Sequence, residues 1–346
     1  MEAVSEAADA YEAMETYHEK GWTDGLPVVP PTPELLDRFL EASGLDAEDV
    51  VFHLAERKRT VRAGKVALNA ILAGCLPSYM PVILAALEAM ADPAYNIHSS
   101  ATSTGGAAPF MVVNGPVRHE IGLNMQGNIY GPGNRAGATI GRALRLVIIN
   151  CLGSKPGLLD RSTQGNPGKY SFTFAEWEET SPWEPLNVEL GYPAGTSTVT
   201  LLAAEGPHNI QNHYGKGRGI AETAAATMAG LGSMSEGQSF FVFAPEHAHL
   251  LGEEFPTKRE LQEYLFENAT LPLSQLLRTG KLDKPIAADE NGNVRHALKP
   301  DDIYIVVAGG EAGGHSSWVP SWSRRRNGEA VSRPVLSAAE RRETRG

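Results

Sequence analysis

The sequence predicts an α/β fold whose mixed sheet is built from two pseudosymmetric units, because two segments repeat one local pattern. Each unit is an apolar strand, a Gly-Pro turn, a polar loop rich in Asn and Gly, and a helix with an arginine near its start. The two strands cover residues 110–113 and 200–204, and their turns are Gly115-Pro116 and Gly206-Pro207. A repeat of this kind is typical of folds whose ligand site lies where equivalent loops meet.

The other elements follow from capping signals and apolar periodicity. Thr32 before Pro33 is typical of a helix N-terminus, and this helix is expected to end near Ser43. Helices are also expected over residues 61–74, 78–90, 136–151 and 257–268, and strands over 240–243 and 303–307. Because ligands gather at the carboxyl ends of strands in open α/β sheets, the strand ends after Val113, Ala204, Phe243 and Val307 are expected to converge on one site.

The chain length of 346 residues suits one large two-lobed domain. We expect an N-terminal helix over residues 1–20 and the domain over 21–323. Within it, the repeated units occupy about 96–152 and 198–235, and a loop-rich insert occupies 153–197. Residues 324–346 are charged and begin with three arginines, which predicts a disordered tail.

Composition excludes several classes of function. A net charge of -11 argues against nucleic acid as a partner, because nucleic-acid binding needs a basic face. No apolar run approaches the roughly 18 to 20 residues that span a bilayer, and the start lacks the order of a secretory signal. With 2 cysteines there is no disulfide framework. We therefore expect a cytoplasmic protein without membrane contact, and a homodimer because enzymes of this size commonly dimerise.

Cys75 is a candidate nucleophile. It lies in Ala73-Gly74-Cys75-Leu76-Pro77, between two expected helices, where a helix N-terminus can stabilise a thiolate. The alternative is a buried, inert cysteine, since cysteine is among the most commonly buried residue types. Cys151 lies in an apolar run and is expected to be core.

Histidines at strand ends are candidate acids and bases. His208 follows Glu205-Gly206-Pro207, and His315 lies in a glycine-rich segment. His208 with Glu205 is the expected acid–base pair, and His247 beside Glu246 is a third strand-end histidine. No HExxH or CxxC motif is present, so no metal site is predicted, and a histidine site with a metal stays an open alternative.

An anionic substrate is expected from the arginines that open the helix of the first unit. Arg135 and Arg142 follow a Gly-Pro-Gly turn, and a helix N-terminus with arginine suits a carboxylate or phosphate. No nucleotide-binding motif is present, and no Gly-x-Ser-x-Gly elbow points to a serine hydrolase. The other residues expected to contact substrate are Asn114, Asn209, Lys216 and Ser316.

Several motifs resemble a family of bacterial proteins associated with the UGSC (Sec-Gly-Ser-Cys) thiol–disulfide oxidoreductase-like group. They are the segments 21–27, 73–79, 165–172, 181–186 and 204–210, spread over most of residues 20–335. The resemblance implies a functional thiol at Cys75 and a role for the Gly-Pro-His-Asn unit that holds His208 and Asn209. The chain has neither Sec-Gly-Ser-Cys nor Cys-Gly-Ser-Cys, so that redox motif would come from a separate small partner.

The sequence is compatible with three functions. The first is an enzyme acting on a small carboxylated metabolite by thiol-assisted redox or lyase chemistry, with Cys75 as nucleophile. The second is a histidine-based lyase or hydratase, with or without a metal. The third is a non-catalytic binding subunit for a small thiol redox protein.

Overall fold

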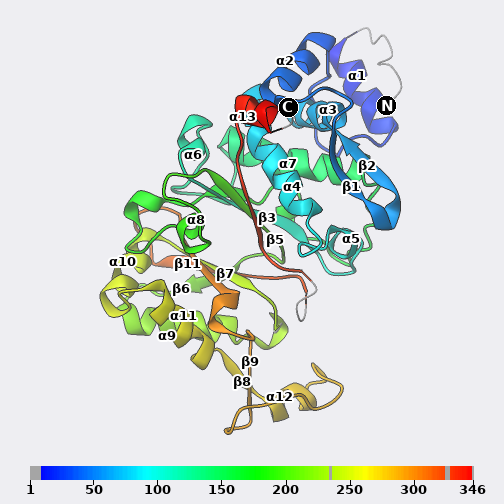
Figure 1. Cartoon of the computed structure of the whole chain (residues 1–346). Helices are drawn as coiled ribbons and strands as arrows, with labels where there is room; N and C mark the ends of the chain where they lie inside the picture. The colour runs from blue at the N-terminus through cyan, green and yellow to red at the C-terminus, as the bar shows by residue number, and fades with distance from the viewer. Residues whose placement is uncertain (1–8, 234–235, 324–327, 345–346) are drawn as a thin grey trace.

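Two four-stranded sheets stack face to face, and helices cover the outer face of each (Figure 1). The computed structural model describes residues 9–233, 236–323 and 328–344. The first sheet has the order β12 (Val331–Pro334), β5 (Thr198–Ala204), β3 (Ala108–Asn114) and β4 (Thr173–Ala175). The second has the order β10 (Ile303–Val307), β7 (Ser239–Phe243), β11 (His315–Pro320) and β6 (His208–Gln211). The mixed α/β fold predicted from sequence is confirmed.

Alternation along the strands of the two large sheets separates the core between the sheets from the cores under the helices. In β3, Phe110 and Val112 face the second sheet, whereas Met111 and Val113 face the helices of the first. Phe110 meets Phe240 of β7 between the sheets, with ring centroids 5.0 Å apart. Because successive strand residues point to opposite faces, a strand buried on both sides is apolar throughout.

Three long helices cover the outer face of the first sheet and three cover that of the second (Figure 1). The first set is α3 (Ala63–Ala73), α4 (Met80–Ala91) and α7 (Arg135–Asn150). The second set is α9 (Gly217–Met228), α10 (Pro245–Glu254) and α11 (Lys258–Asn268). At the N-terminal end lie α1 (Ala10–Glu19), α2 (Pro33–Ser43) and the hairpin of β1 (Val50–Leu54) and β2 (Arg59–Arg62).

Shorter elements complete the described chain. The short helices are α5 (Ile97–Ser100), α6 (Val117–Glu120) and α8 (Leu186–Glu189). A projecting arm below the second sheet holds β8 (Thr270–Pro272), α12 (Leu273–Arg278) and β9 (Asn293–Arg295) (Figure 1). Among the described residues, no helix has the length and apolar character that crossing a membrane requires.

The arrangement does not confirm the pseudosymmetry that the repeat predicted. Strands β3 and β5 are antiparallel neighbours in one sheet, with Asn114 opposite Thr198, so their carboxyl ends lie at opposite edges. The helix of the first unit covers the first sheet, and that of the second unit covers the second sheet. The turns also differ, because Gly115 has φ +80° and lies against the Thr196 carbonyl, whereas Gly206 has no positive φ. The repeat is one of local order only.

The prediction of a disordered tail over 324–346 is wrong for residues 328–344. The expected disordered tail contains β12, which pairs with β5, and α13 (Ala338–Glu343), which packs beside α2. Apolar burial of Val331 and a capping box at Ser337 explain why this charged segment folds. Residues 324–327, with the three arginines, lie outside the described chain. The insert expected over 153–197 is mostly loop, and it also supplies β4, an edge strand of the first sheet.

Candidate functional site

A pocket of about 330 Å³ lies where several strands end, at one edge of the space between the two sheets. Strands β7 and β10 are parallel, so their carboxyl ends meet, and the chain leaving β5 reaches the same place. The lining residues are Ile129, Tyr130, Pro207, Asn209, Val242, Ala244, Ala308, Gly309, Gly310, Ala312, Gly313, His315, Ser316 and Ser317. The end after Val113 is absent from this lining because β3 runs the other way, but the loop that follows it returns as Ile129 and Tyr130.

His315 is the ionisable side chain among the pocket's lining residues that is best placed for proton transfer. It begins β11 and shares a face with Ser317 and Val319, the face that looks toward the first sheet. Its Nδ1 atom lies 3.2 Å from the Asn209 Oδ1 atom. Because that oxygen can only accept, Nδ1 is the donor in this contact, and Nε2 is the ring nitrogen left for a substrate. An imidazole oriented in this way can act as a general base through Nε2.

A pair of hydroxyl groups lies on the same face of β11. The Tyr130 hydroxyl and Ser317 Oγ are 2.9 Å apart. Ser317 is two residues from His315, a separation of about 7 Å along a strand. A small substrate between them would contact a base at one end and hydroxyl donors at the other. Sequence reasoning missed both Tyr130 and Ser317, although strand alternation would have placed Ser317 beside His315.

The glycine-rich loop from Gly309 to Gly314 forms one wall of the pocket. Gly309, Gly313 and Gly314 have positive φ, which only glycine adopts readily. The Glu246 carboxylate, in the first turn of α10, accepts from the Gly313 and Gly314 N–H groups at 2.7 and 3.0 Å, and these bonds lower its pKa. Within the described residues, the N–H groups of 310–312 have no partner, and Gly310 and Ala312 line the pocket.

Ser316, expected to contact substrate, is among the lining residues of the pocket, but its hydroxyl lies on the other face of β11. Its Oγ atom accepts from the Ala244 N–H group at 3.0 Å and lies 2.8 Å from His247 Nδ1. His247 Nε2 lies 2.9 Å from the Asn212 carbonyl oxygen, which can only accept, so Ser316 donates to Nδ1. Burial lowers the pKa of His247. This pair holds the start of α10 against β11 behind the pocket.

The predicted acid–base pair of His208 and Glu205 is not in the pocket. His208 on β6 pairs with Trp318 on β11, and their ring centroids are 5.2 Å apart. Its side chain is on the face of the sheet opposite the one that carries Asn209. Burial lowers its pKa. Glu205 follows β5, and its backbone N–H donates to the Pro320 carbonyl. Neither residue lines the pocket. For His208 the reason is that alternation along β6 turns its side chain to the other side of the sheet.

Cys75 belongs to the core under the first sheet and does not line the strand-end pocket. Its thiol donates to the Thr139 carbonyl at 3.2 Å, and burial raises its pKa to about 12. A thiol with that pKa is protonated at neutral pH, which corrects the prediction of a stabilised thiolate. Burial likewise raises the pKa of Cys151, to about 11.

The expected anion clamp is already occupied by the protein. Both guanidinium bonds from Arg142 to Asp24 are 2.8 Å long, and Arg135 donates to the Gly74 carbonyl at 3.0 and 3.1 Å. Lys216 is an exposed residue before α9 and does not line the pocket. These three residues are therefore not brought together at one site.

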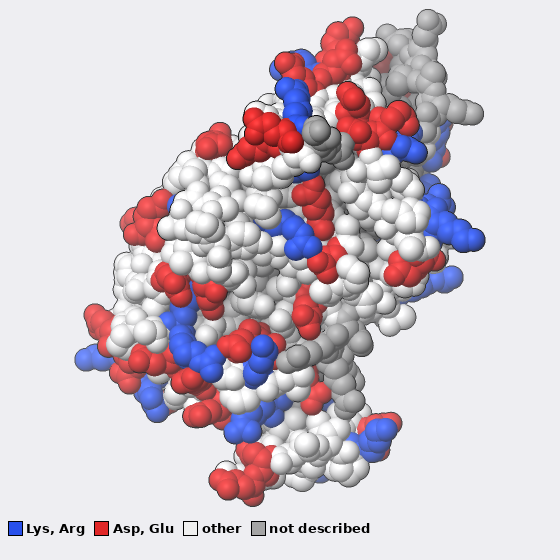
Figure 2. Space-filling model, in the orientation of Figure 1, with Lys and Arg blue, Asp and Glu red and all other residues white. Residues whose placement is uncertain are grey.

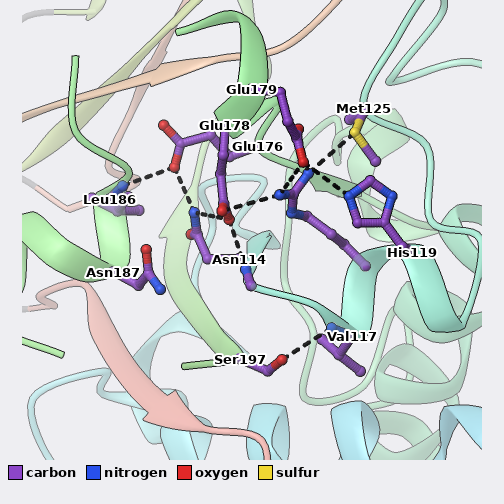
Figure 3. A network of polar contacts seen from close by, with 12 residues as sticks. Asn114, Val117, His119, Met125, Glu176, Glu178, Glu179, Leu186, Asn187 and Ser197 are labelled. Atoms are coloured by element: carbon purple, nitrogen blue, oxygen red, sulfur yellow. Dashed lines mark hydrogen bonds and ion pairs between the residues drawn. The ribbon is translucent and has the colours of Figure 1, made fainter. Parts of the chain in front are cut away.

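Asn114, another predicted substrate contact, is fully buried in a structural network (Figure 3). Its Nδ2 atom donates to Glu176 at 2.6 Å and to Glu178 at 3.1 Å, and Arg118 joins Glu178 to Glu179. Strands β3 and β4 are parallel, so this network ties their carboxyl ends together. Burial raises the pKa of Glu176, whose Oε1 atom has no partner among the described residues.

The surface of the molecule carries charges of mixed sign. On the face shown in Figure 2, Lys and Arg side chains are interspersed with Asp and Glu and form no continuous basic tract. Among the described residues, no group of three or more His, Cys, Asp or Glu side chains is placed to hold a metal ion. The chain matches no protein-family model, no curated protein and no solved structure.

Proposed function

We propose that this chain is an enzyme that uses histidine-based acid–base chemistry in the strand-end pocket, as a lyase or hydratase acting on a small substrate. The observation that carries the proposal is the placement of His315, which Asn209 holds with its Nε2 lone pair available, two residues from the hydroxyl pair of Ser317 and Tyr130. This is the second of the three functions that the sequence predicted.

The residues have distinct roles in such a reaction. His315 Nε2 takes a proton from carbon, and the bond between the neighbouring carbon and its leaving oxygen breaks. Tyr130 or Ser317 gives a proton to that oxygen, so water leaves and the carbon–carbon double bond forms. The backbone N–H groups of 310–312 stabilise negative charge that develops on a substrate carbonyl. Run in reverse, the same groups add water.

The pocket limits the size and character of the substrate. A volume of about 330 Å³ is at the lower end of ligand pockets, which span roughly 300 to 1,000 Å³. Ile129, Val242 and Ala308 supply apolar walls. The part of the substrate that reacts is therefore a short carbon skeleton with oxygen substituents.

The thiol hypothesis receives no support from the position of Cys75, whose pKa of about 12 opposes a nucleophilic role. The resemblance to the UGSC-associated family, docking of a small redox protein, the homodimer and the cytoplasmic location stay predictions from sequence.

Deuterium exchange tests the proposal with a panel of candidate substrates. The protein is incubated in D₂O with small hydroxylated and unsaturated carboxylic acids, and incorporation at carbon is followed by NMR. We expect exchange or water addition with at least one compound, and its loss in His315→Gln. His53→Gln is the matched control, because His53 is exposed on β1, far along the chain from the pocket. Equal rates in wild type and His315→Gln would reject the proposal.

A further inference from the structure

A second pocket, of about 630 Å³, lies between α7 and the segment 156–170. Its lining residues are Thr23, Asp24, Arg145, Ile149, Pro156, Gln164, Gly165, Asn166, Pro167, Lys169 and Tyr170. Arg145 is one helical turn beyond Arg142, on the helix where the sequence predicted an anion clamp.

This pocket carries an excess of positive charge. Asp160 accepts from Arg145 at 2.5 Å and from Lys169 at 2.8 Å, so two cations share one carboxylate. Asp160 itself is not among the lining residues, and the carboxylate that is, Asp24, is neutralised by Arg142. One positive charge is therefore left without a counterion, and Arg145, which bears part of it, is only 6% exposed. Buried charge is costly unless it is paired.

Unused hydrogen-bond donors accompany this charge. Only one nitrogen of the Arg145 guanidinium has a partner among the described residues, which leaves further N–H groups for a ligand. The Asn166 Oδ1 atom accepts from the Gly168 N–H at 2.8 Å, but its Nδ2 atom is buried and has no partner in the described chain. A guanidinium and an amide donor in one pocket suit the oxygens of a carboxylate or phosphate.

A third pocket, of about 350 Å³, shares lining residues with this site and with the strand-end pocket. It shares Ile129 and Tyr130 with the strand-end pocket, and Pro167 and Tyr170 with the cationic one. Its lining includes Thr173, which is 4% exposed and whose hydroxyl has no partner among the described residues. The third pocket therefore adjoins both of the others, and it holds an unpaired polar atom of its own.

We propose that the pocket of Arg145, Lys169 and Asn166 is an anion subsite, which binds the carboxylate or phosphate of an elongated substrate whose other end reacts at His315. Tyr170, Ile149 and Pro156 provide apolar surface for the carbon skeleton beside the anion. Binding of the anion stands on the pocket alone, whereas its role in the substrate rests on the proposed function.

Isothermal titration calorimetry of the full chain tests the subsite with two probes, inorganic phosphate and succinate. We expect saturable binding of at least one probe to the wild type. Arg145→Gln should weaken it roughly 10- to 100-fold, because it removes a charge-assisted hydrogen bond. Tighter binding of phosphate would indicate a phosphate ester as substrate, and tighter binding of succinate a carboxylate.

A second variant tests anion binding in case Arg145→Gln does not fold. Asn166→Asp retains the oxygen that accepts from Gly168 but replaces the free amide donor with a negative oxygen, so it should abolish binding of either probe. The matched control is Arg278→Gln, which removes an exposed arginine at the end of α12 and should bind as the wild type does. Wild type that binds neither probe, or Asn166→Asp that binds as tightly as wild type, would overturn the subsite.

His315→Gln separates the two proposals. It should bind the anion as the wild type does while failing in the exchange assay. If the exchange assay shows no role for His315 but Asn166→Asp still loses the anion, the proposed chemistry fails and the subsite stands. Conversely, exchange that depends on His315 without anion binding would remove the subsite alone.

Discussion

His247 Nδ1 lies 2.8 Å from Ser316 Oγ, on the face of β11 opposite the one that carries His315. The contact ties the first turn of α10 to β11, and the neighbouring Glu246 holds the glycine-rich loop through Gly313 and Gly314. The base and the loop that form the pocket are thus supported from behind by a buried hydrogen-bonded pair.

Replacing His247 should loosen this support. We expect His247→Ala to lower the free energy of unfolding by about 1 to 3 kcal/mol, because Ser316 and the Asn212 carbonyl lose their buried partner. Urea denaturation measures the change. His249→Ala is the control, since His249 is exposed on the same helix and should change stability far less. Equal losses in the two variants would show that the buried pair contributes nothing.

Acid should destabilise the protein through a buried histidine. Both ring nitrogens of His296 are without partners in the described chain, and burial lowers its pKa from 6.5 to about 4. Between these two pH values the unfolded chain binds a proton at this histidine and the folded chain does not. The free energy of unfolding therefore falls as pH drops from about 6.5 to 4, by about 1.4 kcal/mol per pH unit.

His296→Phe should flatten the fall in unfolding free energy between pH 6.5 and 4, when denaturation curves are recorded at several pH values. His18→Phe, at an exposed position on α1, is the control and should retain the full slope. An unchanged slope in His296→Phe would show that this histidine is not the group responsible.

The opposite pH dependence is expected from Glu176. Burial raises its pKa above 4.5, so the folded chain retains a proton that the unfolded chain loses, and this carboxyl costs stability as pH rises above 4.5. Glu176→Gln keeps the shape and an acceptor for the Leu186 N–H. The free energy of unfolding of the variant, relative to that of the wild type, should therefore be larger at pH 8 than at pH 5. Thermal denaturation at the two pH values measures the gain, and a gain that is larger at pH 5 would refute it.

Cys75 should resist alkylation in the folded protein. With a pKa of about 12 and its thiol donated to the Thr139 carbonyl, it presents almost no thiolate at pH 8. We expect iodoacetamide to label Cys75 only after unfolding, as read by mass spectrometry. Rapid labelling of Cys75 in native protein at pH 7 would restore the thiol hypothesis.

Local features of the fold could be predicted from the sequence, because apolar runs and caps are local signals. The strand expected over residues 303–307 is β10, and the helix expected over 136–151 is α7, from Arg135 to Asn150. Strand order could not be predicted in the same way. The antiparallel pairing of β3 with β5, and the addition of β12 at the edge, depend on contacts between distant segments.

In the candidate site, too, local signals could be predicted from the sequence and contacts between distant segments could not. His315 and Asn209 stand out in the sequence because each follows a Gly-bearing strand end, and the structure brings them together. Tyr130 could not be found, because it reaches the second sheet through a loop that starts from the first. The position of His208 could not be predicted, because it depends on the register of β6 against β11, which places His208 opposite Trp318.

The most direct test compares two variants in the deuterium-exchange assay, with whichever compound of the panel the wild type turns over. We expect His315→Gln to lower the rate by roughly 10² to 10⁴, the usual contribution of a general base, and Cys75→Ser to leave it unchanged. A rate that survives in His315→Gln and is lost in Cys75→Ser, with both variants folded, would contradict the assignment of His315 and place the chemistry at the thiol.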